Sequence, residues 1–149
     1  MNKARIDSKT EKKEPKSCEI RMDVSFCDLD PMQVVWHGNY FKYFDKARFA
    51  LFAQYGVDLY EFYENNQYLF PLVRTSVKYV QSLRYGDEFI CKAILREAKI
   101  KIVLDFEIRR VKDNKLCVKA QSEQVTLKMP EMEMMFHIPE EIQRALESK

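Results

Sequence analysis

The stretch NYFKYFDKARFALFAQYG, residues 39–56, decides the fold class of this 149-residue chain. Its apolar residues recur at steps of three and four, a spacing that places side chains on one face of an α-helix. They are Tyr40, Phe41, Phe44, Ala47, Leu51 and Tyr55. Gly56 follows at a typical C-cap position, so we expect the helix to end there. The heavy aromatic content predicts a thick helix that is buried against a sheet.

Most of the remaining periodic segments read as strands. In residues 100–109, apolar side chains alternate with charged ones, which is the pattern of a half-buried strand that includes Ile100 and Phe106. Further strands are expected at residues 18–26, 71–80, 89–95 and from Lys115 or Leu116 onward. Short helices are expected at residues 58–65 and 140–147. Val125 and Leu127 break the alternation of the last strand, which indicates a β-bulge.

The order of these elements predicts the architecture. Consecutive strands joined by short turns, such as the one at Asp113-Asn114, are expected to be antiparallel neighbours. The apolar face of the aromatic helix has to be buried, and a curved antiparallel sheet wrapped around the helix is the simplest arrangement that buries it. We therefore expect an α+β fold with one long central helix, formed by residues 17–149 as a single domain. Residues 1–16 hold almost nothing apolar and are expected to form a disordered polar tail.

Composition argues against several classes of function. The 25 Lys+Arg and 23 Asp+Glu residues give a net charge of +2, so we expect no nucleic-acid partner. No stretch approaches the roughly 20 apolar residues that span a bilayer, and we expect no membrane insertion. The four cysteines form no C-x-x-C pair, which favours a reduced, cytoplasmic protein. His37 and His137 are the only histidines and no glycine-rich phosphate loop occurs, so neither a metal nor a cofactor is expected.

The candidate chemistry lies in DLDPMQVVWHGNY, residues 28–40, which join the first strand to the long helix. A helix N-terminus presents unpaired N–H groups and the positive end of the dipole, so it suits an oxyanion or a polarised carbonyl. The carboxylate of Asp30 lies seven residues before His37, and from a loop it can reach the carbon attached to that oxygen. Asp-x-Asp is also common turn chemistry, so the spacing leaves a purely structural role open.

This loop resembles the signature of the 4-hydroxybenzoyl-CoA thioesterase family of hotdog-fold acyl-CoA thioesterases. The resemblance rests on Asp-x-Asp-Pro-x-x-x-Val-Trp-His-x-Asn-Tyr in residues 28–40 and on Phe44-Asp45-Lys46-Ala47-Arg48 in the helix. Residues 79–87 are similar to the family's strand end that closes on Gly-Asp, and residues 138–142 resemble its C-terminal region. Together these segments cover almost the whole chain after the tail.

The resemblance implies a hotdog fold and hydrolysis of an acyl-CoA thioester to a carboxylic acid and CoA. It makes Asp30 the catalytic carboxylate, which attacks the carbonyl or activates a water, and gives Asp28 a structural role. The backbone N–H of His37 would polarise the carbonyl, and its imidazole is a candidate proton carrier. The implied substrate-binding residues are Trp36, Gly38, Asn39 and Tyr40, of which Asn39 and Tyr40 are also expected to fix the helix start.

The resemblance further implies a homodimer or homotetramer whose active sites lie between subunits. Lys78, Arg84 and Lys128 are candidates for holding the CoA tail, although a solvated charged face explains them equally well. Gln33 departs from the family, because many relatives place Gly there, where a compact loop can use positive φ. Two alternatives remain open: hydrolysis of acyl groups on acyl-carrier protein, and a non-catalytic acyl-CoA-binding hotdog module.

Overall fold

The computed structural model describes residues 14–147, so most of the predicted tail, residues 1–13, lies outside the described residues. Two 3₁₀ turns, η1 (Phe26–Asp28) and η2 (His37–Asn39), precede the first helix. The helices are α1 (Tyr40–Gln54), α2 (Leu59–Asn66) and α3 (Glu140–Glu147). The strands are β1 (Ser17–Asp23), β2 (Tyr68–Leu69), β3 (Leu72–Tyr79), β4 (Glu88–Ala98), β5 (Ile102–Arg110), β6 (Leu116–Gln124), β7 (Thr126–Lys128) and β8 (Glu133–Met135).

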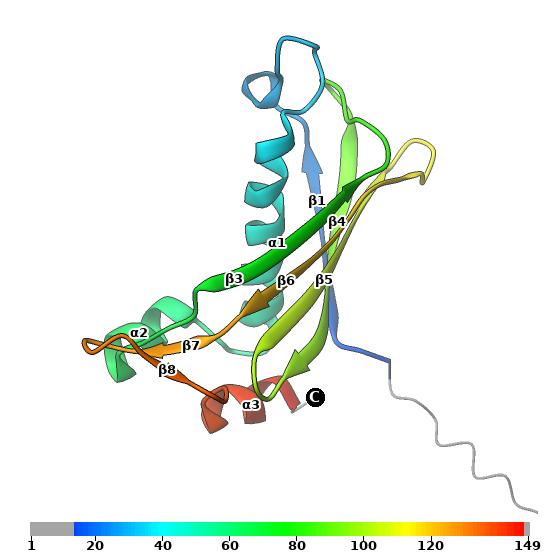
Figure 1. Cartoon of the computed structure of the whole chain (residues 1–149). Coiled ribbons are helices and arrows are strands. Elements are labelled where there is room, and N and C mark those ends of the chain that lie inside the picture. The colour runs from blue at the N-terminus through cyan, green and yellow to red at the C-terminus, as the bar shows by residue number, and fades with distance from the viewer. Residues whose placement is uncertain (1–13, 148–149) are drawn as a thin grey trace, which may run out of the picture.

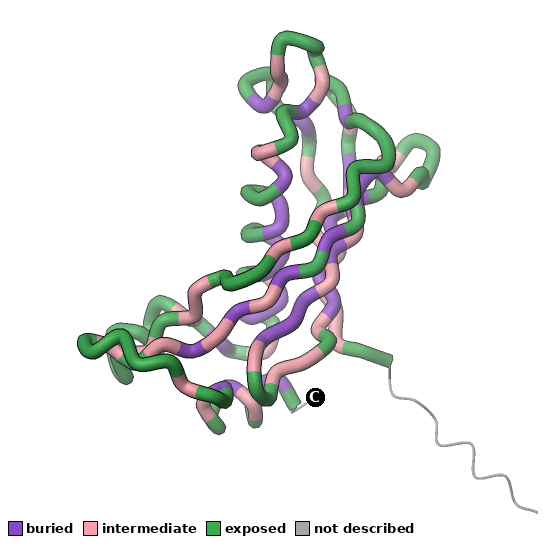
Figure 2. The backbone as a smooth tube through the Cα atoms, viewed as in Figure 1, coloured by how far each residue is buried: buried purple, intermediate pink, exposed green. Residues whose placement is uncertain are grey.

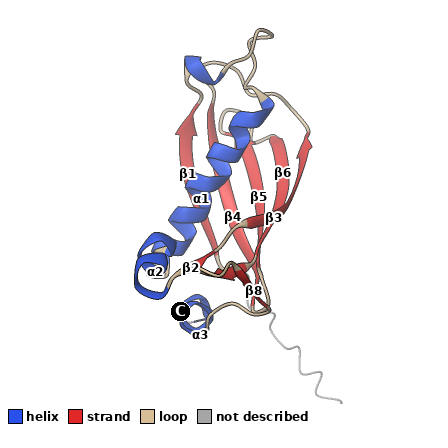
Figure 3. Ribbon diagram, turned by 60° about the vertical axis from the view of Figure 1, so that its left-hand side comes forward, coloured by secondary structure: helices blue, strands red, loops and turns tan. Residues whose placement is uncertain are grey.

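Five strands form one antiparallel sheet in the order β1-β4-β5-β6-β3. The sheet curves, and α1 runs across its concave face (Figures 1 and 3). The predicted α+β architecture, with one long helix held by a curved antiparallel sheet, is therefore confirmed. Among residues 14–147, no helix is long and apolar enough to span a membrane.

The core lies between α1 and the middle strands of the sheet. The inner face of α1 is buried along its length, as are the facing parts of β4, β5 and β6 (Figure 2). The ring centroid of Phe44 lies 4.9 Å from that of Phe106 on β5, and the ring centroid of Tyr43 lies 4.7 Å from that of Phe89 on β4. The aromatic residues that predicted a thick helix therefore fill the space under the sheet, and apolar burial holds the helix in place.

The alternation predicted for β5 is confirmed over most of its length, since Ile102, Leu104, Phe106 and Ile108 are buried. Ile100 is 61% exposed because it lies in the turn before the strand begins. The first strand is also shorter than predicted. It ends at Asp23, and Phe26 belongs to η1 with 76% of its surface exposed. In both places the apolar residues of the sequence pattern continue beyond the residues that pair with a neighbouring strand.

The neighbours of β3 differ from the prediction. β4, β5 and β6 follow one another as antiparallel neighbours, but β3 pairs with β6 instead of β4. Residues 80–87 carry the chain from one edge of the sheet to β4, which lies beside β1 at the other. As a result, β3 is an edge strand, and none of its residues is fully buried.

The predicted β-bulge at Val125 and Leu127 is wrong. Polar residues instead continue the buried side of β6, because Ser122, Gln124 and Thr126 are all inside. The burial of Ser122 is explained by Arg48 of α1, whose Nη2 donates a hydrogen bond to Ser122 Oγ at 2.8 Å. The guanidinium needs a polar partner at that depth, and an apolar residue would leave it without one.

A second, three-stranded sheet in the order β2-β7-β8 was not predicted from the sequence. Its strands have two or three residues each, too few to show a period. It continues beyond the main sheet near α2 and α3 (Figure 1).

The loop between β1 and α1 is fastened to the helix by Asp28. Its carboxylate accepts hydrogen bonds from Lys42 Nζ at 2.8 Å and from the Tyr43 hydroxyl at 2.7 Å. Its carbonyl oxygen accepts from the Trp36 N–H at 2.9 Å and from Asn39 Nδ2 at 2.8 Å. The expected structural role of Asp28 thus has a specific form, in which one buried residue ties the loop to the first turns of α1.

Replacing Phe106 by alanine should lower the free energy of unfolding by about 3–5 kcal/mol, because the ring is 1% exposed and its loss leaves a cavity against Phe44. The matched control is Phe136→Ala. That ring is 82% exposed, so the change should stay within about 0.5 kcal/mol. Urea unfolding at one protein concentration measures both. Equal losses would contradict the placement of the core.

The Asp28 anchor predicts a pH dependence. Burial alone would raise the pKa of Asp28, but the hydrogen bonds from Lys42 and Tyr43 outweigh it and hold the pKa below its ordinary value of 3.8. The unfolded chain therefore takes up the proton first as the pH falls. The stability supplied by Asp28 is present at neutral pH and declines as the pH falls past 3.8 toward the lower pKa of the folded state. Asp28→Asn should unfold more easily than wild type at pH 7, with the gap narrowing toward pH 3. An unchanged gap in urea midpoints would exclude the anchor.

Candidate active site

Asp30 sits in a tight turn that leaves one of its oxygens available. The turn is closed by a hydrogen bond from the Gln33 N–H to the Asp30 carbonyl and by one from the Asp30 N–H to the Val34 carbonyl, each 2.9 Å long. Asp30 Oδ1 accepts from the Met32 N–H at 2.8 Å. Within residues 14–147, Oδ2 has no hydrogen-bond or ion-pair partner. The turn thus fixes the carboxylate while leaving an oxygen free to act on a bound molecule.

Gln33 has a φ of 61°, the left-handed conformation that glycine adopts most easily. The loop therefore does use positive φ at the position where many relatives carry Gly. The side chain of Gln33 is exposed and does not line the pocket described below. This departure from the family pattern changes the backbone preference of the turn without changing the residues around the carboxylate.

The start of the helix supplies backbone donors. η2 begins at His37 and runs directly into α1, and the Asn39 N–H donates to the Trp36 carbonyl at 2.9 Å. The N–H groups of His37 and Gly38 have no acceptor among the described residues. Free N–H groups at a helix N-terminus carry partial positive charge and stabilise a developing oxyanion.

Trp36 packs directly on this turn. A Cβ atom at position 38 would lie 2.3 Å from the Cζ3 atom of the Trp36 ring, so glycine is the residue that fits beneath it. The ring centroids of Trp36 and His37 are 5.1 Å apart. The indole thus fills the space where a side chain at position 38 would lie, and it borders the imidazole. Trp36 and Gly38, two predicted substrate-binding residues, therefore lie beside His37.

Asp30 and His37 line one pocket of about 220 Å³ beside the helix start. Its walls are Asp30, Met32, Val34, Val35, His37, Tyr40, Tyr79, Val80, Gln81 and Ser82. The pocket thus joins the loop, the first residue of α1 and the end of β3. It combines a carboxylate, a helix start and an apolar wall, a combination that can hold an apolar group and polarise a carbonyl attached to it.

The other predicted site residues fall in different places. Tyr40 borders the pocket, and burial raises the pKa of its hydroxyl to about 12, so it stays neutral in the physiological range. Asn39 does not line the pocket, because its amide holds the carbonyl of Asp28. Trp36 and Gly38 lie next to the pocket rather than in its wall. The three basic candidates for the CoA tail are exposed and outside it: Lys78, Arg84 and Lys128.

Sequence reasoning missed the contribution of β3. Tyr79, Val80 and Gln81 form one side of the pocket, although they lie far along the chain from the loop. In the sequence, residues 79–87 were noted only for their similarity to a strand end of the family, and no contact with the loop was predicted for them. The missing information was which strand ends beside the helix start, and the structure supplies it through the bridge between Val34 and Arg84.

Comparison with known proteins identifies relatives of this chain. A curated 1,4-dihydroxy-2-naphthoyl-CoA hydrolase from Thermosynechococcus vestitus is 29% identical over 69 residues, which are 46% of this chain and 47% of that relative. The match therefore spans about half of the relative's length.

Solved structures share the fold. A 1,4-dihydroxy-2-naphthoyl-CoA thioesterase from Synechocystis superposes with a TM-score of 0.80 at 20% identity, covering 87% of this chain and 95% of that one. The 4-hydroxybenzoyl-CoA thioesterase from Pseudomonas sp. strain CBS-3 gives 0.77 at 18% identity, covering 87% and 99%. The architecture is therefore the hotdog fold that the resemblance implied.

The family assignment rests on a family model that matches most of the chain. The model of the Thioesterase-like superfamily matches residues 24–146, a span that includes the loop, α1, the pocket and every strand after β1. The chain therefore belongs to the Thioesterase-like superfamily.

Proposed function

We propose that this protein is an acyl-CoA thioesterase. The observation that carries the proposal is the shared pocket, in which the carboxylate of Asp30 and the helix start at His37 face the same space. A thioester hydrolase needs these two groups on one carbonyl: one acts on the carbon and the other stabilises the oxygen. The substrate is a CoA thioester, as in the names of the relatives described above.

The reaction follows from the placement of these groups. The acyl carbonyl oxygen lies at the N–H groups of the helix start, which stabilise the negative charge as the carbon becomes tetrahedral. The carboxylate of Asp30 either attacks the carbon, giving an anhydride that water then opens, or removes a proton from an attacking water. The C–S bond breaks, the thiolate leaves as CoA and takes up a proton, and the acyl group leaves as a carboxylic acid. The imidazole of His37 is the proposed proton carrier at the pocket edge.

Two other functions use the same fold. An acyl-carrier-protein thioesterase would keep Asp30 and meet an acidic carrier at the pocket mouth, and a binding module would hold the thioester without cleaving it. Asp30 favours an enzyme, because its Oδ2 is unused by the fold and a pure binder has no need of a free carboxylate. The CoA thioesterase is favoured over the carrier-protein enzyme by the names of the relatives.

We also propose that the protein acts as a homodimer, or as a tetramer of such dimers, in the cytoplasm. The outer edge of β3 has no neighbouring strand within residues 14–147, and its exposed apolar residues include Val73 and Tyr79. Such an edge is a template for pairing, and a second copy fits it by two-fold symmetry. The cytoplasmic location rests on the four cysteines, which are all free thiols.

Replacing Asp30 by asparagine should abolish turnover, because the amide can neither attack the carbonyl nor take a proton. Release of CoA from acetyl, medium-chain, long-chain and aromatic acyl-CoAs measures it, with a protein-only blank for the cysteine thiols. The variant should keep the wild-type melting curve and still bind acyl-CoA. His37→Ala should lose less activity, since its backbone N–H remains. Near-normal turnover in Asp30→Asn would show that Asp30 takes no part in the reaction. If the wild-type protein cleaved none of these acyl-CoAs, the remaining candidates would be a binding module and a carrier-protein enzyme.

Replacing Val73 by lysine should weaken assembly at least tenfold, because lysine on an edge strand blocks strand pairing. Val73 is exposed on β3, and Ile100→Lys provides the matched control, since Ile100 is exposed in the turn before β5. Light scattering over a range of concentrations gives the mass of each protein. A monomeric wild type, or equal assembly by both variants, would contradict pairing through β3.

A further inference from the structure

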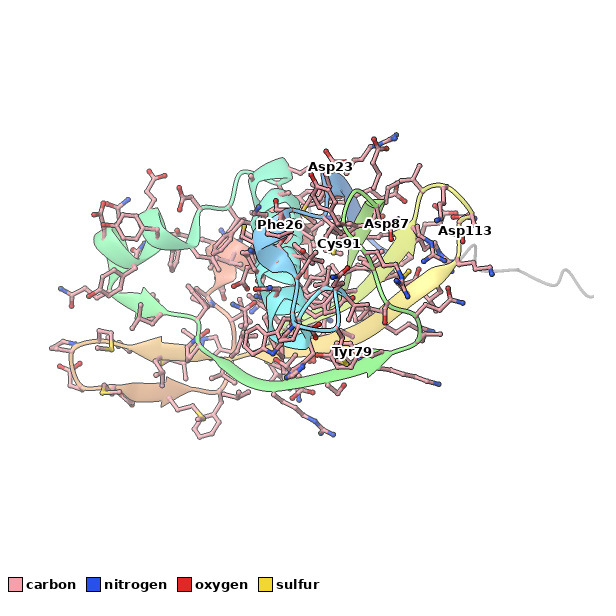
Figure 4. All side chains as sticks on the ribbon, turned by 90° about the horizontal axis from the view of Figure 1, so that it is seen from above. Asp23, Phe26, Tyr79, Asp87, Cys91 and Asp113 are labelled. Carbon is pink, nitrogen blue, oxygen red and sulfur yellow. The ribbon has the colours of Figure 1, made fainter. Side chains whose placement is uncertain are left out.

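Tyr79 connects the edge strand of the sheet to the start of the helix. It is the last residue of β3, and its hydroxyl donates a hydrogen bond to the backbone carbonyl of His37 at 3.1 Å, across 42 residues of sequence. Figure 4 shows Tyr79 on β3 beside the loop that leads into α1.

The carbonyl that Tyr79 holds belongs to the peptide group whose N–H is that of Gly38. A peptide group is planar, so a hydrogen bond that fixes its oxygen also fixes the direction of its N–H. Donation to the oxygen polarises the group as well, which makes its N–H a better donor. A hydroxyl on β3 therefore acts on one of the two N–H groups that have no acceptor within the described chain.

The Tyr79 ring is held so that its hydroxyl stays in place. Its centroid lies 5.4 Å from that of Tyr40, and Tyr40 packs edge-on against Tyr43 with centroids 5.8 Å apart. Tyr40 and Tyr43 are buried in the core. Partial burial raises the pKa of the Tyr79 hydroxyl, so it remains protonated and able to donate at physiological pH. The contact thus rests on a row of packed rings rather than on a mobile side chain.

We infer that Tyr79 is a positioning residue for the oxyanion site. Its hydroxyl orients the His37–Gly38 peptide beside the pocket in which Asp30 lies. The inference rests on the proposed function for its effect on catalysis, but the orientation of the peptide can be measured without a substrate. β3 would then have two roles. It would pair with a second copy of the chain, and it would hold the start of α1 through Tyr79.

The first test measures the peptide itself. The chain has only three glycines, so labelling with ¹⁵N-glycine gives one amide signal each for Gly38, Gly56 and Gly86. In Tyr79→Phe the ring remains but the hydroxyl is lost, and only the Gly38 signal should shift. Tyr60→Phe is the matched control, because Tyr60 is exposed on α2, and it should leave the Gly38 signal in place. An unmoved Gly38 signal in Tyr79→Phe would overturn the inference.

The second test separates positioning from structure by kinetics. Tyr79→Phe should lower kcat about tenfold with KM within about twofold of wild type, because a misaimed donor weakens stabilisation of the transition state more than binding of substrate. Tyr60→Phe should leave both values unchanged. An unchanged kcat in Tyr79→Phe would remove its role in catalysis. If wild type itself cleaves no thioester, the proposed function fails, and the Gly38 signal alone decides whether Tyr79 orients the peptide.

Discussion

The carboxylate of Asp28 is the contact on which the site depends. It is 4% exposed, and a charge at that depth is stable only when its hydrogen bonds are satisfied. Lys42 and Tyr43 satisfy them from the first turns of α1, while its backbone carbonyl holds Trp36 and Asn39. One residue therefore sets the distance between the turn that carries Asp30 and the turn that carries the free N–H groups.

The sheet brings the third wall of the site to the same place. β3 ends beside the start of α1, and residues 79–82 complete the pocket that the loop and the helix begin. Each wall has a different physical support: a satisfied carboxylate for the loop, aromatic packing for α1, and the ladder with β6 for β3.

The local patterns of the sequence were enough to predict the helix and most of β5, and they singled out the loop as the candidate site. The three- and four-residue spacing from Tyr40 to Tyr55 allows few alternatives to a buried helix, and the Asp30 to His37 segment matches a family motif. Three features depend on distant partners and could not be predicted in this way. Ser122 is buried because Arg48 reaches it, β3 lies at the far edge because residues 80–87 cross over, and Tyr79 meets His37 only in the folded chain.

Asp30 and the helix start are proposed to act on the same carbonyl. A crystal structure of Asp30→Asn with an uncleaved acyl-CoA tests this most directly. We expect the thioester oxygen within about 3 Å of the N–H of His37 or Gly38, and the carbonyl carbon next to the side chain at position 30. The structure would contradict the account if the thioester lay elsewhere, for example in the groove of about 260 Å³ between α2 and α3.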